Sequence, residues 1–183
     1  PRVLDKMKKP GIESYERFAD SFCKASEKAG KEQYLVPYFI TGHPGSTLAD
    51  TVELALYLKR KGMRPRQVQD FIPTPMSMAT SMYYTGLDPF TQEPVHTAHE
   101  LREKRQMKAL LFYWDPKQQP LAREALKRAG RGDLIGRGPN CLVPPEGGSS
   151  FPTFMQNRPA TPYDKPRNDK TRRLRANKGK RRP

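Results

Sequence analysis

Apolar residues recur at helical spacing in two segments of the first half of the chain. Residues 12–29 place their apolar side chains three and four positions apart. Residues 47–62 repeat this pattern, with Ser46 or Thr47 as a candidate cap at the start and Gly62 as a stop. The pattern predicts two amphipathic helices.

Two short apolar runs flank the second of these helices. Residues 33–40 read QYLVPYFI with little alternation, which is typical of a strand covered on both faces. Pro37 counts against a central position because proline cannot donate to a sheet ladder. Residues 66–72, RQVQDFI, form the second run. Strand, helix and strand at this spacing predict a βαβ unit with parallel strands.

The pattern changes after residue 80. Glycines and prolines punctuate residues 81–97, whereas residues 98–113 and 119–130 again carry apolar side chains at helical spacing. Beyond Glu146 no apolar periodicity remains. We therefore expect three parts, namely a βαβ part, a mostly helical extension and a disordered basic Pro-rich tail, at residues 1–80, 81–145 and 146–183.

Charge is concentrated in the predicted tail. The 183-residue chain carries a formal charge of +15, of which residues 146–183 contribute +8 from 11 Lys or Arg and 3 Asp or Glu. Such a segment cannot bury enough apolar surface to offset the entropy of ordering. It also suits weak, salt-dependent binding of nucleic acid or of an acidic partner. A merely solvated tail is the alternative.

Composition excludes several classes of protein. No segment approaches the roughly 18 apolar residues that cross a bilayer, and the start of the chain has no apolar leader core. Cys23 and Cys141 are too few for a disulfide framework. We expect a cytoplasmic protein with no membrane partner.

The turn between the first strand and its helix carries the candidate chemistry. In YFITGHPGST, residues 38–47, glycine would let a ligand approach the backbone at Gly42 and Gly45, and free N–H groups at the helix start would suit a carboxylate. His43 is either an acid–base or ligand-binding group, or a side chain bonded to the backbone. The alternative for the whole stretch is a tight turn without a ligand.

The βαβ unit is not a finished sheet, because it leaves two open edges and an incomplete core. Either the strands complete a larger sheet that begins upstream, or the strand predictions are wrong. The start at Pro1 rather than Met favours the first alternative. Gln69 and Asp70, polar residues in an apolar strand, then face either a lumen or solvent.

Four stretches together resemble a known family. In order along the chain they read VLDKMKKPG, YLVPYFITGHPGSTLADTVELALYLK, QVQDFIPTPMSMATSMYYTGLDPFT and EALKRAGRGDLIGRGPNCLVPP. They are similar to the C-terminal portion of the YgiQ-type radical SAM proteins, and the similarity covers about residues 1–145.

The resemblance implies a partial (β/α)6 barrel, of which this chain would supply the C-terminal βαβ part. It also implies a 4Fe-4S cluster, held by a CxxxCxxC loop, that cleaves S-adenosylmethionine to a 5′-deoxyadenosyl radical. These 183 residues contain no CxxxCxxC. The cluster ligands are therefore expected in an upstream part of the same protein, and this chain alone is expected to be inactive.

The resemblance also implies cofactor-binding residues. The turn is similar to the family's adenine-contacting turn, although Tyr38 stands at its first glycine and Ser46 replaces the acid of related turns. The second strand would meet adenine through its backbone. The expected S-adenosylmethionine contacts are Ile40, Gly42, Pro44, Gly45, Gln69 and Asp70. No catalytic or metal-binding residue is expected in this chain.

Three functions remain open at the level of sequence. The first is the C-terminal region of a radical SAM enzyme of unknown substrate, contributing part of the S-adenosylmethionine pocket. The second is a basic adaptor that binds RNA or an acidic partner through residues 146–183. The third is a structural module in which the Gly-rich stretch is only a turn.

Overall fold

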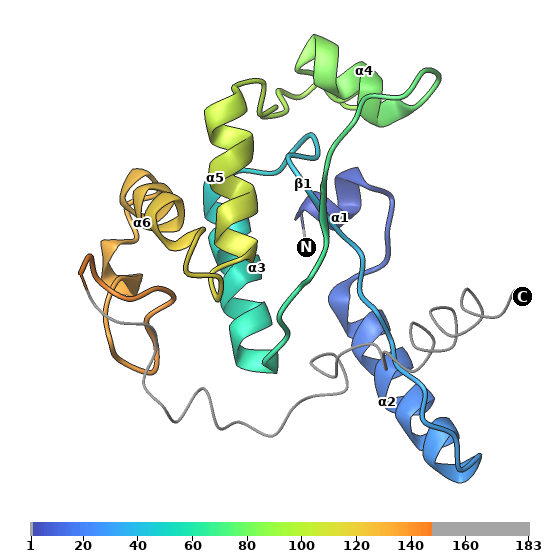
Figure 1. Ribbon diagram of the computed structural model, residues 1–183. Helices are drawn as coiled ribbons and strands as arrows, with labels where there is room; N and C mark the ends of the chain where they lie inside the picture. The colour runs from blue at the N-terminus through green and yellow to red at the C-terminus, as the bar shows by residue number, and fades with distance from the viewer. Residues whose placement is uncertain (1, 148–183) are drawn as a thin grey trace, which may run out of the picture.

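Helices and one short parallel sheet make up the part of the chain that the computed structural model describes, residues 2–147. The predicted α/β class is confirmed (Figure 1). The predicted disorder of the tail concerns residues that lie almost entirely outside the described range. The elements are α1 (Arg2–Lys6), α2 (Ile12–Lys28), β1 (Phe39–Thr41), α3 (Leu48–Lys61), β2 (Val68–Asp70), α4 (Met78–Thr85), α5 (Leu101–Leu111), α6 (Gln119–Arg128) and a 3-10 turn, η1 (Gly132–Leu134).

The two strands pair in parallel, as the βαβ prediction requires. Phe39 lies opposite Val68, and Thr41 lies opposite Asp70. Both strands are shorter than the predicted 33–40 and 66–72. In this register, residues 33–38 would have to pair with residues 62–67, which include the left-handed Gly62 at the end of α3 and Pro65, which cannot donate to a ladder. The first six residues of this apolar run therefore have no β-partner among residues 2–147.

Local signals fix both ends of α3. Thr47 has an extended backbone, its hydroxyl accepts from the N–H of Asp50, and the Asp50 carboxylate accepts from the N–H of Thr47. This reciprocal pair satisfies two N–H groups that the first helical turn leaves without partners. Gly62 ends the helix in the left-handed conformation with φ 64°. Of the two candidate caps, the structure therefore selects Thr47.

The apolar core lies on one side of the sheet. Helix α5 packs between α3 and α6 and also contacts both strands (Figure 1). Its inward side chains are fully buried, and Val68 reaches the same core from β2. The largest buried side chains of this core are Val52, Leu58, Met107, Leu110, Leu111, Leu126, Leu142 and Val143.

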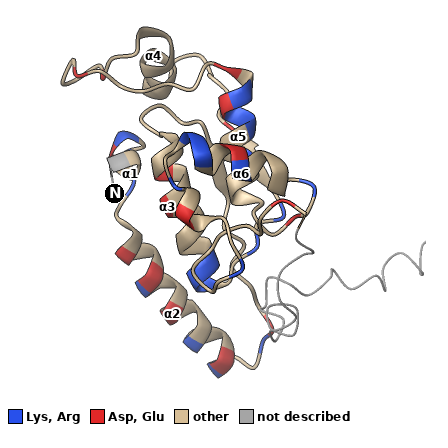
Figure 2. Cartoon of the chain, turned by 90° about the vertical axis from the view of Figure 1, so that its left-hand side faces the viewer, with Lys and Arg blue, Asp and Glu red and all other residues tan. Residues whose placement is uncertain are grey.

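Helix α2 stands apart from this core. It runs away from the α3–α5–α6 cluster and carries both acidic and basic side chains along its length (Figures 1 and 2). Its attachment to α3 includes Glu16, whose carboxylate lies 2.7 Å from the Lys61 ammonium and accepts from the Tyr57 hydroxyl. The helix has the predicted bounds to within one residue, but its aromatic side chain Phe18 is 56% exposed.

Two helices were not predicted from the sequence. Helix α1 is too short to show a periodic pattern. Helix α4 holds no charged residue in its first or last turn, and it falls where turns were expected. Its ends do carry the usual signals, because the Ser77 hydroxyl accepts from the N–H of Thr80 and Gly86 follows with φ 67°. None of the helices in the described part combines the length and apolar character needed to cross a membrane.

Candidate functional site

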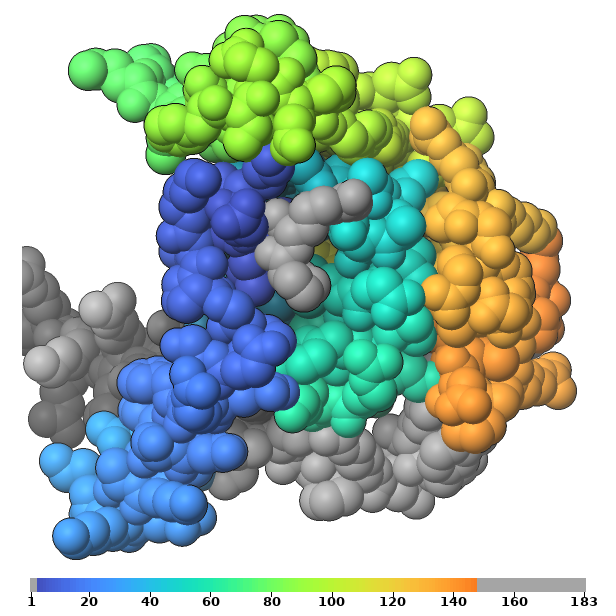
Figure 3. Space-filling model, turned by 180° about the vertical axis from the view of Figure 1, so that it is seen from behind, coloured from blue at the N-terminus to red at the C-terminus, as the bar shows by residue number. Residues whose placement is uncertain are grey.

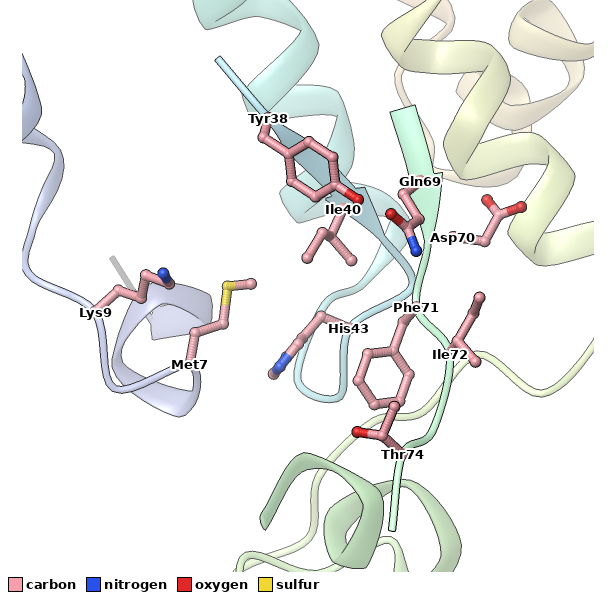
Figure 4. Close-up of a pocket in the computed structure, with 10 residues that line it drawn as sticks. All are labelled: Met7, Lys9, Tyr38, Ile40, His43, Gln69, Asp70, Phe71, Ile72 and Thr74. Atoms are coloured by element: carbon pink, nitrogen blue, oxygen red, sulfur yellow. The ribbon is translucent and has the colours of Figure 1, made fainter. Parts of the chain in front are cut away.

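A hollow of about 410 Å³ lies between the end of α1 and the sheet. One wall comes from the segment after α1 and the other from the two strands and the residues that follow them (Figure 4). The hollow is open to solvent and mostly apolar. Its lining residues are Met7, Lys9, Tyr38, Ile40, His43, Gln69, Asp70, Phe71, Ile72 and Thr74.

The alternation of the strands explains why apolar side chains line this wall. Phe39 and Val68 are paired and point toward the helical core. Their neighbours Ile40 and Gln69, also paired, point to the opposite face, as side chains alternate along a strand. Ile40 is 36% exposed there and Tyr38 is 62% exposed. The sheet thus has one face covered by helices and one face open to the hollow.

His43 lines the hollow just after the carboxyl end of β1. The side chain is only 7% exposed, and its ring meets the edge of Phe71 with centroids 5.2 Å apart. Nδ1 lies 2.8 Å from the carbonyl oxygen of Pro44, so Nδ1 carries the proton and donates it. Burial lowers the pKa of His43, an effect only partly offset by this hydrogen bond. The imidazole is therefore neutral at pH 7.

The predicted glycine contacts have a different environment. Gly42 and Gly45 have φ values of 67° and 87°, which favour glycine, and neither lines the hollow. A Cβ on Gly45 would lie 3.2 Å from Cγ of Lys6, and one on Gly42 would meet Lys104. Pro44 is fully buried. Side chains of this chain fill the space beside the turn, so a nucleoside contact at these three residues stays a prediction.

The N–H groups of the turn that leads into α3 already have acceptors within the chain. The N–H of Gly45 donates to the carbonyl of His96, and that of Ser46 donates to the carbonyl of His43. The N–H of Thr47 donates to Asp50 within the capping pair. The chain's own acceptors therefore take the N–H groups of the turn and the cap, and a carboxylate contact at the first N–H groups of α3, those of Leu48 and Ala49, stays a prediction.

Gln69 and Asp70 point to opposite faces of the sheet. Gln69 lies on the open face beside Ile40 (Figure 4). The carboxylate of Asp70 turns toward the helical side, where it accepts from the Thr41 hydroxyl at 2.9 Å and pairs with Lys108 at 3.1 Å. Of the six predicted contacts, Ile40 and Gln69 present their side chains to the hollow, whereas Asp70 contributes at its edge.

The α1 wall is held in place by an ion pair that sequence reasoning missed. The Lys6 ammonium lies 2.6 Å from the Asp88 carboxylate, and both side chains are largely buried. Asp88 also accepts from the N–H groups of Phe90 and Thr91. The hydrogen bond from Lys6, together with these N–H groups, lowers the pKa of Asp88 to about 2. Figure 3 shows the dark blue α1 segment lying against the light green segment that follows α4.

This wall supplies Met7 and Lys9 to the hollow (Figure 4). Lys9 is exposed, and none of the ion pairs found within residues 2–147 involves it. It is the one lysine or arginine among the lining residues. Nothing local in the sequence marks Lys9, because its position depends on a contact between residues 82 positions apart.

The residues that line the hollow suit S-adenosylmethionine but not a 4Fe-4S cluster, the other expected cofactor. Apolar side chains, a neutral imidazole and a lysine around a hollow of this size suit a nucleoside joined to a carboxylate, as in S-adenosylmethionine. The 4Fe-4S cluster has no counterpart here, because residues 2–147 contain no group of three His, Cys, Asp or Glu that would hold a metal. Cys23 and Cys141 are unpaired single thiols.

Comparison with known proteins decides the family. A family model described as "Domain of unknown function (DUF3362)" matches residues 66–181. The chain belongs to the DUF3362 family. The match extends beyond residue 145, where the resemblance seen in the sequence ended. No solved structure matches the chain at a significant level.

The DUF3362 chain is also similar to curated UPF0313 proteins. It is 51% identical to one from Methanosarcina mazei over 142 residues, 78% of this chain and 23% of the relative. It is 53% identical to one from Pseudomonas aeruginosa over 146 residues, 77% of this chain and 20% of the relative. UPF0313 proteins are the YgiQ-type family, so the predicted resemblance is confirmed. The chain spans about a fifth of the length of these relatives.

Proposed function

We propose that this chain is the C-terminal region of a radical SAM enzyme and that its hollow holds part of S-adenosylmethionine. When bound with its cluster, that cofactor supplies a 5′-deoxyadenosyl radical. The observation that carries the proposal is the position of the hollow. It lies at the carboxyl end of two parallel strands, on the sheet face opposite the helices, which is where α/β barrels bind their ligands.

In this proposal the open sheet face is the inner face of a partial barrel. A barrel strand presents one face to the helices outside and one to the lumen. Phe39 and Val68 face the helices, and Ile40 and Gln69 face away from them. The remaining strands and the CxxxCxxC loop would come from the part of the protein that the longer relatives possess. Residues 81–145 would then form an extension outside the barrel.

Each wall of the hollow has a task in this proposal. Ile40 and Phe71 give the nucleoside an apolar surface, and the Gln69 side chain lines the hollow beside them. Lys9 on the opposite wall supplies a positive charge for the carboxylate of the methionine part. The chain's own contribution is thus to bind and orient the cofactor, and the cluster chemistry belongs to residues elsewhere.

A charge introduced on the open face tests the proposal. In the full-length protein that contains this chain, Ile40→Asp places a carboxylate against the base and is expected to weaken binding of S-adenosylhomocysteine at least tenfold. Val36→Asp is the matched control, because Val36 lies on the same segment, is 84% exposed and does not line the hollow. Isothermal titration calorimetry measures both. Equal affinities for the two variants would contradict the proposed pocket.

The adaptor function has no further support in the described residues. It depends on the charge of residues 146–183, most of which lie outside the described range. Binding of RNA or an acidic partner through this segment stays a prediction from composition.

A further inference from the structure

The segment that forms the α1 wall lies outside the apolar core. None of residues 3–9 belongs to the core of the described chain, and residues 8–13, which lead from α1 into α2, are exposed. Helix α1 has only five residues, and a helix of that length is not stable without contacts to the rest of the protein. The segment therefore depends on a few side-chain contacts for its position.

Lys6 makes the most buried of these contacts. Its ammonium lies 2.6 Å from the Asp88 carboxylate and 3.8 Å from that of Glu93. Its stem passes beside Gly45, where an added Cβ would lie 3.2 Å from Cγ of Lys6. The side chains of Lys6 and Asp88 are only 15% and 5% exposed, so removing one partner leaves the other charge poorly solvated. We call this ion pair the latch, because it fastens α1 to the turn after α4.

The residues that follow the latch line the hollow. Met7 comes directly after Lys6, and Lys9 lies three positions further along the chain than Lys6 (Figure 4). The latch and these two lining residues thus belong to one short segment, which moves as a unit if the latch opens. A ligand that contacts Met7 and Lys9 therefore favours the latched state, and by linkage the latched state favours the ligand.

We propose that residues 3–9 act as a strap, which opens at the latch to admit a ligand and closes over it. Lys6 and Asp88 are then positioning residues, because they act through Met7 and Lys9 and do not line the hollow themselves. The identity of the ligand as S-adenosylmethionine rests on the proposed function, whereas the opening of the strap does not depend on it. The apparent affinity falls with the fraction of molecules that are latched.

Hydrogen exchange of the full-length protein without ligand tests whether the strap opens by itself. The N–H groups of Met7, Lys8 and Lys9 donate to carbonyls within α1, so their exchange reports on the strap. We expect them to exchange at least tenfold faster than the buried backbone of α5. Asp88→Asn should speed their exchange about tenfold further and leave α5 unchanged. Glu93→Gln, which removes a carboxylate near the same ammonium, should have little effect.

Binding of S-adenosylhomocysteine, measured with protein purified without oxygen, tests whether the strap holds the ligand. Asp88→Asn is expected to weaken binding about tenfold, mainly through faster dissociation, because an unlatched strap no longer retains the ligand. Glu93→Gln is expected to bind as the unchanged protein does. Saturating ligand should slow exchange at residues 7–9 in the unchanged protein. Lys6→Met keeps the stem beside Gly45 and removes the charge, so it should reproduce the effects of Asp88→Asn.

The possible failures are distinguishable. If the unchanged protein does not bind S-adenosylhomocysteine, the proposed function falls, and exchange without ligand still decides whether the strap opens. If residues 7–9 exchange as slowly as α5, the segment is a rigid wall and the strap is overturned. The same holds if breaking the latch speeds exchange equally throughout the protein, or leaves ligand dissociation unchanged. Lys6→Met keeps the test decisive if Asp88→Asn does not fold, and exchange in the unchanged protein needs neither variant.

Discussion

The proposed contact between Lys9 and the carboxylate of S-adenosylmethionine can be tested by comparing ligands with and without that carboxylate. We expect Lys9→Met to weaken binding of S-adenosylhomocysteine about 3- to 10-fold, because an exposed charge pair contributes modestly. Binding of methylthioadenosine, which has no carboxylate, should not change. Calorimetry with the two ligands measures the difference.

The neighbouring lysine provides the control for this experiment. Lys8 lies over the ring of Phe90, 5.2 Å from its centroid, and does not line the hollow. Lys8→Met removes the same charge from the residue directly before Lys9. It should leave the affinities for both ligands unchanged. If the two lysine substitutions had equal effects, general electrostatic attraction would explain them, and a carboxylate contact at Lys9 would be wrong.

At the scale of residues, the sequence could name residues near the hollow but not the contacts around them. Ile40 was expected from the family resemblance, and the sequence left open which way Gln69 faces; both side chains line the hollow, and whether they contact a cofactor stays a prediction. Gly45 was predicted to admit a ligand, but Lys6 occupies the space beside it. Lys6 is far from Gly45 along the chain, and no local pattern shows that the two meet.

Among the elements, α3 has the best-defined start. Thr47→Ala removes the hydroxyl that accepts from the N–H of Asp50 and should lower the free energy of unfolding by about 1 kcal/mol. Ser46→Ala is the control, because Ser46 precedes the cap and its side chain takes no part in the capping pair. Urea unfolding followed by circular dichroism measures both. If Ser46→Ala lowered the free energy of unfolding more than Thr47→Ala, the assignment of Thr47 as the cap would be wrong.

Elements that depend on local signals were predicted better than elements that depend on a partner far along the chain. Helices α2, α3, α5 and α6 were predicted to within a few residues, because periodicity and caps act within a few turns. The strands were predicted too long, because strand length depends on the partner: Gly62, which ends α3, and Pro65, which has no N–H, limit how far β2 can pair. Helix α4 was missed although Ser77 and Gly86 bound it, because its uncharged sequence has no contrasting polar face.

At the scale of the whole molecule, the Lys6–Asp88 ion pair joins the first helix of the described chain to the segment that follows α4. The pKa of Asp88 is lowered from 3.8 to about 2 in the folded protein. The pair therefore stabilises the fold fully above pH 3.8, and this contribution is lost as the pH falls through 2. We expect Asp88→Asn to lower the free energy of unfolding at pH 7, with the difference from the unchanged protein shrinking toward pH 2.

Urea unfolding at a series of pH values measures this difference and cancels the titration of the other carboxylates. Glu93, at 3.8 Å from the Lys6 ammonium, is 70% exposed and makes a suitable control as Glu93→Gln. A stability difference for Asp88→Asn that did not depend on pH would show that the Asp88 charge is not what holds α1.

The attachment of α1 also governs how the protein can be trimmed for crystallisation. A fragment designed around the sheet and the buried helices would begin near α2, and by every measure of core packing it would look complete. It would nevertheless lack Met7 and Lys9, together with the lysine stem that covers Gly45. Such a fragment would yield a stable crystal of half a binding site, so domain boundaries for this protein belong ahead of α1.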